Sequence, residues 1–259
     1  MAAKLPGDGD AYALTYHMVD RIFRLMPFLS AGGDTWEEPW HEKRPCMRMI
    51  AIVMCAGAML GALLSAATGQ TPAGTMRFAI MRNGEQIGTH AIEISRSGAE
   101  TNVRTTTDLT VKVLFVTAYR LQHNATERWV NGQLVAFAST TDNNGTRHKV
   151  SATMGSAGLE VDADGKTSRV DKGVVPASLW NPEFLKRKTV LDTQDGQLDQ
   201  ISVTDGGTED LSFDGRAIKA HHYQMKGRYA QDLWYDERGR LVQVKLVGSD
   251  GSVISYRPI

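Results

Sequence analysis

Cysteine is almost absent from this sequence. Only Cys46 and Cys55 occur among its 259 residues, and both precede residue 68. The rest of the chain therefore has no disulfide to stabilise it, and a domain there depends on its hydrophobic core. The stretch 68–259 is long enough to bury such a core as one domain.

An excess of charge is missing too. The 29 basic residues (Lys and Arg) balance the 29 acidic ones (Asp and Glu). Proteins that bind nucleic acids neutralise backbone phosphates with clustered basic side chains. The balance of charges therefore predicts no nucleic-acid partner.

Motifs of well-known reactions are also absent. The sequence contains no GxSxG, no HExxH, no phosphate-binding loop, no paired CxxC and no dinucleotide-binding glycine pattern after a strand. No short ligand spacing of the kind that binds zinc is present either. We therefore predict no catalytic residue, no metal and no cofactor, and we favour a protein that is not an enzyme.

One long apolar run is present, between residues 47 and 67. It reads MRMIAIVMCAGAMLGALLSAA, with a basic residue near its start and small residues, Ser65 and Ala67, at its end. This is the plan of a secretory signal peptide that is cut after Ala67. An uncleaved membrane anchor is the alternative, since the run is about long enough to cross a bilayer.

The position of this run divides the chain. Because a signal peptide begins at the N-terminus, we expect residues 1–46 to be an upstream extension that the mature protein lacks. Residues 68–259 are then a single β domain, periplasmic or secreted after cleavage. We expect contact with a membrane only through the signal segment.

Turn signals recur through the exported part. Asn-Gly or Asp-Gly pairs begin at positions 83, 131, 144, 164, 195, 205, 214 and 250. Such pairs favour tight hairpin turns. Between them, Val103 to Phe115 and Tyr119 to Val130 alternate apolar and polar residues, as a strand with one buried face does. The sequence predicts an all-β fold, an antiparallel meander that forms a strongly curved sheet or open β-barrel.

A single short helix is expected near 182–188. Asn181 can cap the free N–H groups at its start, and Pro182 suits the first helical position. A helix this short needs packing to be stable. Trp180, Phe184 and Leu185 are the side chains expected to anchor it over the sheet, either as part of the core or as a lid over a cavity.

Histidines recur on the apolar faces of the predicted strands. His90, His123, His148 and His222 each share strand parity with apolar neighbours, so all four are predicted to point inward. They could form one polar cluster that orients a ligand or exchanges protons. Each could instead be hydrogen-bonded separately within the core.

Two sets of candidate site residues follow from this pattern. Glu127 shares the face of His123, and Asp142 and Arg147 flank the turn before His148. We take these three as a candidate polar cluster. The candidate ligand-binding set adds aromatic side chains, which are also typical of a plain core: Tyr119, His123, Trp129, His148, Trp180 and Phe184.

Four segments carry a resemblance to a known family. They read VKVLFVTAYRLQHNATERWVNGQLV, TDNNGTRHKVSA, SLWNPEFL with LDTQDG, and DLWYDERGRLVQV. In this order they resemble an uncharacterised family of secreted Gram-negative envelope proteins, a domain of unknown function, over most of 76–257. The resemblance implies export and an all-β domain, and it assigns no catalytic residue. The architecture is also similar to that of periplasmic lipoprotein carriers, which hold acyl chains in a curved half-barrel under a short helical lid.

Three functions remain open at this point. The long amphipathic strands and the aromatic helix favour binding of a hydrophobic or lipid-like small molecule in the concave face. An envelope interaction or scaffold protein with a filled core is the alternative. The least favoured is a hydrolase that uses His123 or His148 with Asp142 or Glu127.

Overall fold

The fold is described from a computed structural model that covers residues 73–248 and 250–259. The expected extension 1–46, the apolar segment 47–67 and both cysteines lie outside the described residues. Within the described part of the chain, no helix is both long enough and apolar enough to cross a membrane.

Fifteen β-strands dominate the described chain. In chain order they are β1 (Gly74–Arg82), β2 (Glu85–Ser97), β3 (Glu100–Val113), β4 (Val116–Val130), β5 (Gln133–Asn143), β6 (Thr146–Met154), β7 (Leu159–Ala163), β8 (Lys166–Val170), β9 (Thr189–Leu191), β10 (Leu198–Gln200), β11 (Ser202–Phe213), β12 (Arg216–Lys226), β13 (Gln231–Asp236), β14 (Leu241–Val247) and β15 (Val253–Pro258). A short 3-10 helix, η1 (Pro182–Lys186), precedes β9. The predicted all-β class is confirmed.

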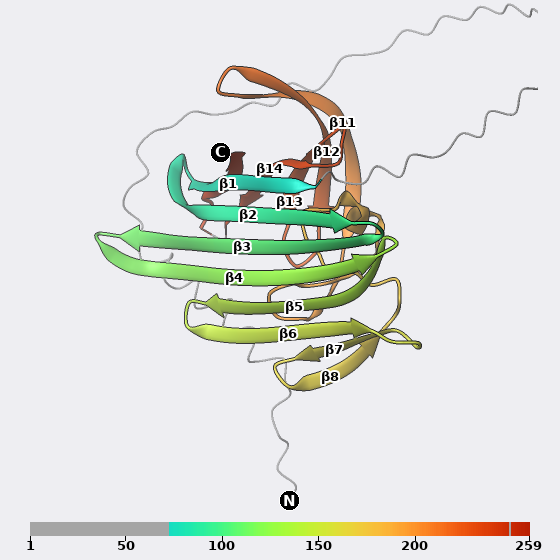
Figure 1. Ribbon diagram of the computed structural model, residues 1–259. Coiled ribbons are helices and arrows are strands. Elements are labelled where there is room, and N and C mark those ends of the chain that lie inside the picture. Colours follow the sequence, from blue (N-terminus) through green and yellow to red (C-terminus); the bar gives the residue numbers. More distant parts are fainter. Residues whose placement is uncertain (1–72, 249) are drawn as a thin grey trace, which may run out of the picture.

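The large sheet contains 13 strands, all antiparallel to their neighbours. Strands β1 to β8 form one meander and β11 to β15 another, and pairing of β1 with β15 joins the two (Figure 1). Strands β8 and β11 are the edges, so the sheet is curved but not closed. This is the predicted open, strongly curved meander.

Bulges contribute to the curvature of this sheet. The register shifts at Ile80/Met81 between β1 and β2, and at Arg128/Trp129 between β4 and β5. A β-bulge bends its strand and increases the local twist. Repeated bulges therefore curl the sheet around its concave face.

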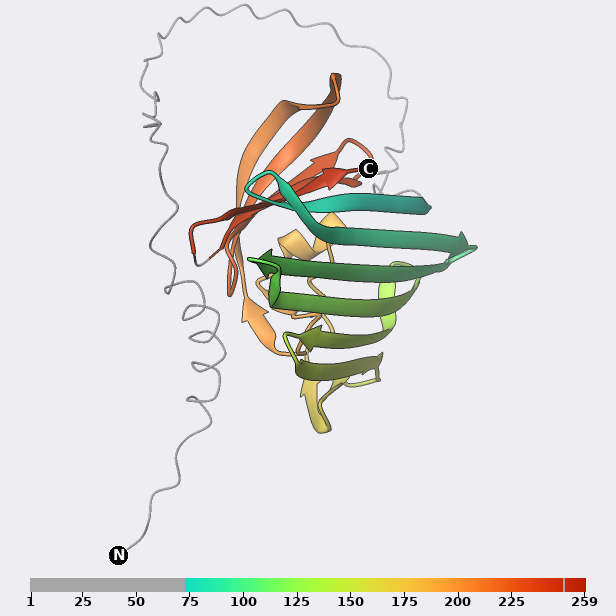
Figure 2. The ribbon, with the colours of Figure 1, turned by 90° about the vertical axis from the view of Figure 1, so that its left-hand side faces the viewer.

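The segment 171–201 leaves the edge strand β8 and lies between the two meanders (Figure 2). Asn181 begins η1 as predicted, because its side-chain oxygen accepts a hydrogen bond from the Glu183 N–H at 3.1 Å. The helix is 3-10 and ends at Lys186, two residues earlier than predicted. Arg187 is extended (φ −93°, ψ 153°), and its N–H donates to the Phe184 carbonyl, which closes the last turn.

The hydrophobic core lies between this segment and the concave face of the sheet. Trp180, Phe184 and Leu185 are only 4%, 2% and 7% exposed, and they belong to one cluster with apolar residues of both meanders. The Trp180 ring packs edge-on against Trp129 of β4, with 5.6 Å between ring centroids. The expected aromatic anchors thus fill part of the concave side from within.

Five hairpin turns have the geometry that their sequence predicts. They begin at Asn83, Asn131, Asn144, Asp164 and Asp214, where φ lies between 48° and 54°, and a glycine with positive φ follows each. These are the angles that Asn-Gly and Asp-Gly adopt in two-residue hairpins. The turn signals in the sequence are confirmed at these five positions.

The β3–β4 turn has the same geometry but a different sequence. Leu114 (φ 47°) and Phe115 (φ 70°) occupy its two central positions and are 86% and 100% exposed. The left-handed conformation costs about 1–2 kcal/mol for a residue with an ordinary side chain. The sequence predicted a continuous strand through Phe115, because no glycine, Asn or Asp marks a turn there.

Shortening Phe184 to alanine should lower the free energy of unfolding by about 3–5 kcal/mol, because the substitution leaves a cavity in the core. Urea denaturation measures this change. The matched control is Glu183→Ala, whose exposed carboxylate contacts the Lys186 ammonium at 2.6 Å. This control should cost less than about 1 kcal/mol. Equal effects of the two substitutions would contradict the packing described above.

Replacing Leu114 by Asn together with Phe115 by Gly should raise the free energy of unfolding by about 1–2 kcal/mol, since the new residues tolerate the left-handed angles. The reciprocal variant, Asn144→Leu with Gly145→Phe, places the same apolar pair in the β5–β6 turn. It should be destabilised by a similar amount in the same urea titration. A loss of stability in the first variant would show that the turn is not strained.

Candidate functional site

A row of alternating histidine and threonine crosses four strands on the concave face. His90 of β2 lies opposite Thr107 of β3, Thr107 opposite His123 of β4, and His123 opposite Thr141 of β5. All four side chains are buried, with 3–6% of each residue exposed. We call these four residues the His–Thr row. It is a polar band inside a concave face that is otherwise largely apolar.

Hydrogen bonds within the row define its donors and acceptors. The Thr141 hydroxyl donates to the Gln194 carbonyl at 2.9 Å, so its oxygen accepts from His123 Nδ1 at 2.9 Å. This places the proton of neutral His123 on Nδ1 and leaves Nε2 as a lone-pair acceptor. His90 Nδ1 contacts the Thr107 hydroxyl at 2.8 Å, while its buried Nε2 has no partner among the described residues.

Burial keeps both histidines neutral. It lowers the pKa of His90 to about 3, with a smaller contribution from the neighbouring His123. Burial alone lowers the pKa of His123 to about 4. The row therefore presents uncharged hydrogen-bonding groups at neutral pH. An unmet acceptor or donor in such a position is unfavourable unless water or a ligand satisfies it.

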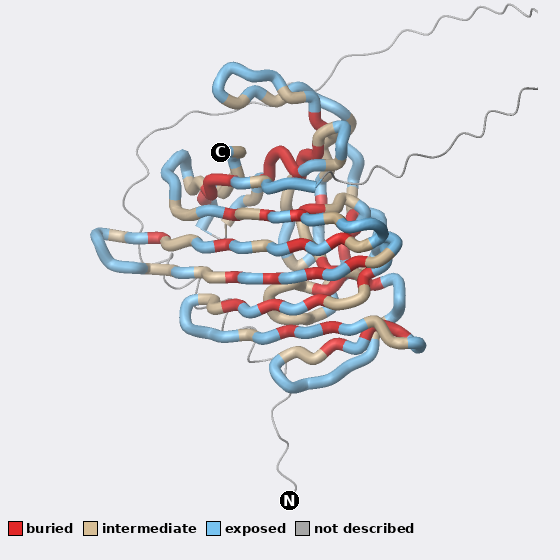
Figure 3. The backbone as a smooth tube through the Cα atoms, viewed as in Figure 1, coloured by how far each residue is buried: buried red, intermediate tan, exposed pale blue. Residues whose placement is uncertain are grey.

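Apolar side chains continue along β3 and β4 from the row toward the β3–β4 turn. Leu109 lies opposite Leu121, and Val111 lies opposite Tyr119, all with the strand parity of the His–Thr row. We call these four residues the apolar strip. Val111 is buried, but the other three are only partly buried, and none of the four belongs to the main core cluster. Figure 3 shows the contrast between the ends of these strands, with fewer buried positions near the turn.

Tyrosines lie on the apolar strip and next to the row, with Tyr119 at the end of the strip that faces the β3–β4 turn. Burial raises the pKa of Tyr119 to about 12, and the nearby Tyr229 and Tyr256 add to this shift. The Tyr256 ring lies 5.2 Å from the His90 ring, measured between centroids. Tyr229 belongs to the β12–β13 turn and is 49% exposed. Tyrosine side chains therefore lie close to both the apolar strip and the row.

A loop formed by residues 192–197 covers one end of the row. The Thr193 carbonyl accepts from the Ser139 hydroxyl at 2.6 Å, next to the bond between Gln194 and Thr141. Gly196 (φ 75°) lies so close to β6 and β7 that a Cβ there would clash with side chains of the sheet. The loop is thus fixed against β5, β6 and β7.

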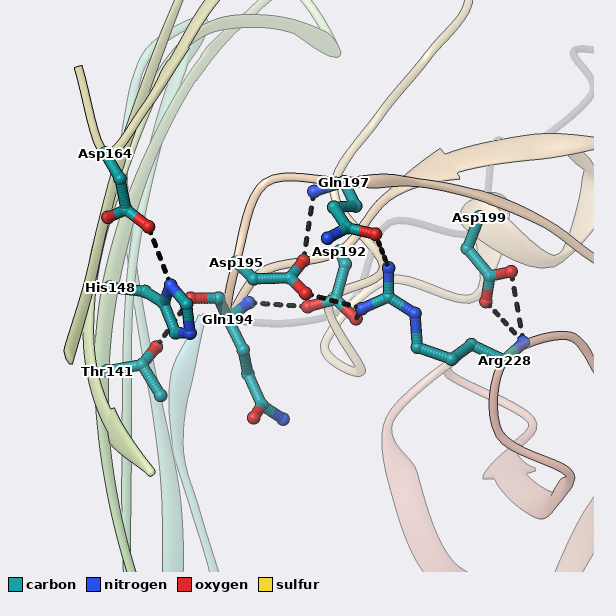
Figure 4. Close-up of polar contacts among 9 residues, drawn as sticks. All are labelled: Thr141, His148, Asp164, Asp192, Gln194, Asp195, Gln197, Asp199 and Arg228. Atoms are coloured by element: carbon teal, nitrogen blue, oxygen red, sulfur yellow. Dashed lines mark hydrogen bonds and ion pairs between the residues drawn. The ribbon is translucent and has the colours of Figure 1, made fainter. Parts of the chain in front are cut away.

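Arg228 fixes the other side of this loop (Figure 4). Its guanidinium donates to Asp192 at 3.1 Å, to Asp195 at 2.7 Å and to Gln197 at 2.7 Å, and its backbone N–H donates to Asp199. Burial raises the pKa of Asp192, and the charge of Asp195 raises it further. The arginine compensates these carboxylates and ties the β12–β13 turn to the loop.

Three of the four predicted aromatic ligand residues, Trp129, Trp180 and Phe184, are part of the closed core, whereas Tyr119 lies on the apolar strip. The indole N–H groups of Trp129 and Trp180 both donate to Glu127 Oε2, at 2.8 and 3.0 Å. Burial raises the pKa of Glu127, and hydrogen bonds from Trp180, Ser178 and Trp129 oppose that shift. Trp129, Trp180 and Phe184 are at most 7% exposed, so packing within the fold occupies their surfaces.

The predicted polar cluster is not brought together. Asp142 pairs with Arg147 at 3.3 Å at the exposed β5–β6 turn, whereas Glu127 lies with the two indoles. His148 is partly buried next to the row and contacts Asp164 at 2.7 Å. Neither His123 nor His148 has a hydrogen bond to Asp142 or Glu127 among the interactions of the described residues.

His222 is on the opposite side of the sheet from the main core, so its predicted inward position is wrong. Its ring stacks on Trp234 with 4.4 Å between centroids, and its Nε2 lies 2.7 Å from Asp232. Trp234 belongs with Ala220 to a second, small cluster. Both faces of β12 and β13 carry apolar residues, so alternation alone could not distinguish the main core from this cluster.

Three residues of the site were not identified from the sequence: Thr107, Thr141 and Arg228. Thr107 and Thr141 share parity with apolar residues of their strands, and this signal could have identified them as inward-facing. Arg228 offers no comparable signal, because its partners in the loop are 31 to 36 residues away along the chain. Among the residues described, no group of three or more His, Cys, Asp or Glu side chains could hold a metal ion.

Comparison with known proteins identifies the family of this chain. A family model described as a domain of unknown function, DUF6134, matches residues 78–259. The chain belongs to this family. No curated protein matches the DUF6134 chain. The predicted membership of an uncharacterised family is therefore confirmed.

One solved structure supports the fold described above, and a second is less similar. A beta-barrel-like protein of domain of unknown function DUF1849 from Brucella abortus has a TM-score of 0.52 at 10% identity, covering 71% of this chain and 94% of that one. A DUF1089 family protein from Pseudomonas aeruginosa has a TM-score of 0.31 at 12% identity, covering 70% and 95%. The first likeness shows a shared β-barrel-like fold and nothing about activity.

The His–Thr row predicts a specific dependence of stability on pH. Below about pH 6.5 the unfolded chain protonates its histidines, whereas His90 and His123 stay neutral in the folded protein. The unfolded state then binds more protons, so the free energy of unfolding falls as the pH falls toward the folded pKa values. Between pH 7 and 5 each histidine should account for about 2 kcal/mol of this loss.

Urea titrations of His123→Gln at pH 7 and 5 isolate one of these contributions. The variant should lose about 2 kcal/mol less than the unsubstituted protein over this interval, because glutamine does not ionise. His221→Gln is the control, since His221 has a side chain that is 37% exposed. An unchanged pH dependence in His123→Gln would mean that His123 is not buried and neutral in solution.

Proposed function

We propose that this domain binds an amphipathic small molecule, such as a lipid, on the concave face of β3 and β4. One observation carries the proposal. The buried His–Thr row directly adjoins the partly exposed apolar strip on the same strands. A polar group and an apolar chain of one ligand would find matching surfaces there, as in other sites that combine apolar walls with a few polar groups.

The chemistry of the row favours an uncharged head group. Neutral His123 offers a lone pair at Nε2, and His90 has an unsatisfied Nε2. Both are suited to hydroxyl or amide groups of a ligand. A carboxylate would lose its hydration next to neutral side chains, which is unfavourable. The Arg228 charge nearby is already compensated by Asp192 and Asp195.

A lipid contact also suits the apolar strip. Leu109, Leu121 and Tyr119 are left partly exposed by a fold whose own core is completed elsewhere, by Trp180 and Phe184. Burying apolar surface yields about 25 cal/mol per Å². An acyl chain along the strip would cover these side chains and extend toward the β3–β4 turn.

The alternative is an envelope interaction or scaffold protein with a filled core. The segment 171–201 supports this alternative, because its side chains already occupy part of the concave side. Under this alternative the His–Thr row would be a purely structural polar band. The exported location expected from the sequence suits both functions and remains a proposal.

Binding of a fluorescent monoacylglycerol to delipidated protein tests the proposal. Leu121→Glu should weaken binding at least tenfold, because it places a charge within the apolar strip. The matched control is Asn124→Glu, an exposed position on the opposite face of the same strand. It should leave the affinity unchanged. The corresponding fatty acid should bind more weakly than the monoacylglycerol at pH 7.

Native mass spectrometry with solvent extraction gives the second measurement. Protein purified gently should retain an apolar molecule, and Leu121→Glu should not. If the native protein carries no lipid and the delipidated protein binds neither probe, the proposal is wrong and the scaffold function takes its place.

A further inference from the structure

The β3–β4 turn stands apart from the other turns at its end of the sheet. Figure 1 shows it projecting beyond the β1–β2 and β5–β6 turns, which have Asn-Gly at their tips. Leu114 and Phe115 adopt the same left-handed angles that Asn and Gly adopt there. Their side chains are almost fully exposed, and Val116 is 68% exposed. The fold therefore gains nothing from these side chains, and the conformation is unfavourable for them.

Charged residues near the tip have one sign. The stretch 109–121 contains two basic residues, Lys112 and Arg120, and no acidic residue. Both are exposed, and neither forms an ion pair with another described residue. By contrast, Arg147 of the neighbouring β5–β6 turn is paired with Asp142. An apolar tip with basic flanks matches a surface that has an anionic outer layer over an apolar interior.

We propose that the β3–β4 turn inserts Leu114 and Phe115 into the interface of an anionic lipid membrane, with Lys112 and Arg120 at the head groups. Apolar side chains at a protruding tip combined with basic residues give this kind of interfacial binding. Tyr229, which is 49% exposed on the β12–β13 turn, lies near Tyr119 of the apolar strip and is a residue type that suits the interfacial region.

The inference goes beyond ligand binding and does not depend on it. The apolar strip leads along β3 and β4 from the tip to the His–Thr row. A tip in the bilayer would thus align the strip with the lipid phase from which an apolar ligand would come. Membrane contact through the tip could nevertheless occur with an empty concave face. The two proposals are therefore tested separately.

Flotation with vesicles of phosphatidylethanolamine and phosphatidylglycerol tests the membrane contact, using protein purified from expression of the full-length sequence. The double variant Leu114→Asn, Phe115→Gly should associate at least tenfold more weakly. Because this variant is expected to fold more stably, unfolding cannot explain a loss. Lys112→Gln and Arg120→Gln should each weaken association about fivefold, and only with anionic vesicles. The control Leu198→Gln alters an exposed leucine that is distant in sequence from the tip and should have no effect.

Because the chain has five tryptophans of its own, the difference in emission between a Phe115→Trp variant and the unsubstituted protein reports on the tip, whatever the N-terminal segment contributes. This added emission should shift to shorter wavelength with vesicles, and brominated lipids should quench it. Flotation of the double variant equal to that of the unsubstituted protein, or absence of quenching, would overturn the proposal. Self-association that is lost in the double variant without any vesicle binding would also overturn it, in favour of a contact between two copies of the chain.

Discussion

Packing of the segment 171–201 inside the curved sheet is the contact on which the rest of the structure depends. The sheet is open between β8 and β11, so its curvature needs support from within. Trp180, Phe184 and Leu185 provide that support by joining apolar residues of both meanders in one cluster. The Glu127 carboxylate is compatible with this dry core because two indole N–H groups bind it.

The same packing explains why the His–Thr row is excluded from solvent but the apolar strip is partly exposed. The loop 192–197 follows the helix, and its carbonyls satisfy the hydroxyls of Ser139 and Thr141. The loop is held in turn by Arg228. Beyond it, toward the β3–β4 turn, the strip remains partly exposed. One insertion therefore divides the concave face into a closed half and a half that is available for contacts.

The sequence predicted the class and topology because alternation and turn pairs are local signals. It predicted the buried His90 and His123 for the same reason. It could not predict their partners, because the β3–β4 and β4–β5 registers each contain a bulge, at Val111/Lys112 and at Arg128/Trp129. If β4 and β5 were paired residue by residue from the Asn131 turn without the second bulge, Thr140 and not Thr141 would lie opposite His123. A one-residue shift of this kind exchanges the two faces of a strand, and nothing in the sequence marks it.

The β3–β4 turn shows where local signals fail for a different reason. Leu114 and Phe115 have no preference for a turn, yet the long flanking strands pair fully and force one there. Cross-strand pairing over the whole hairpin thus outweighs the unfavourable angles of two residues. Asn and Gly would remove that cost without loss of packing, since neither side chain touches the core. Two apolar residues in such a place are explained by a contact outside the fold, and their basic flanks favour a membrane as that contact.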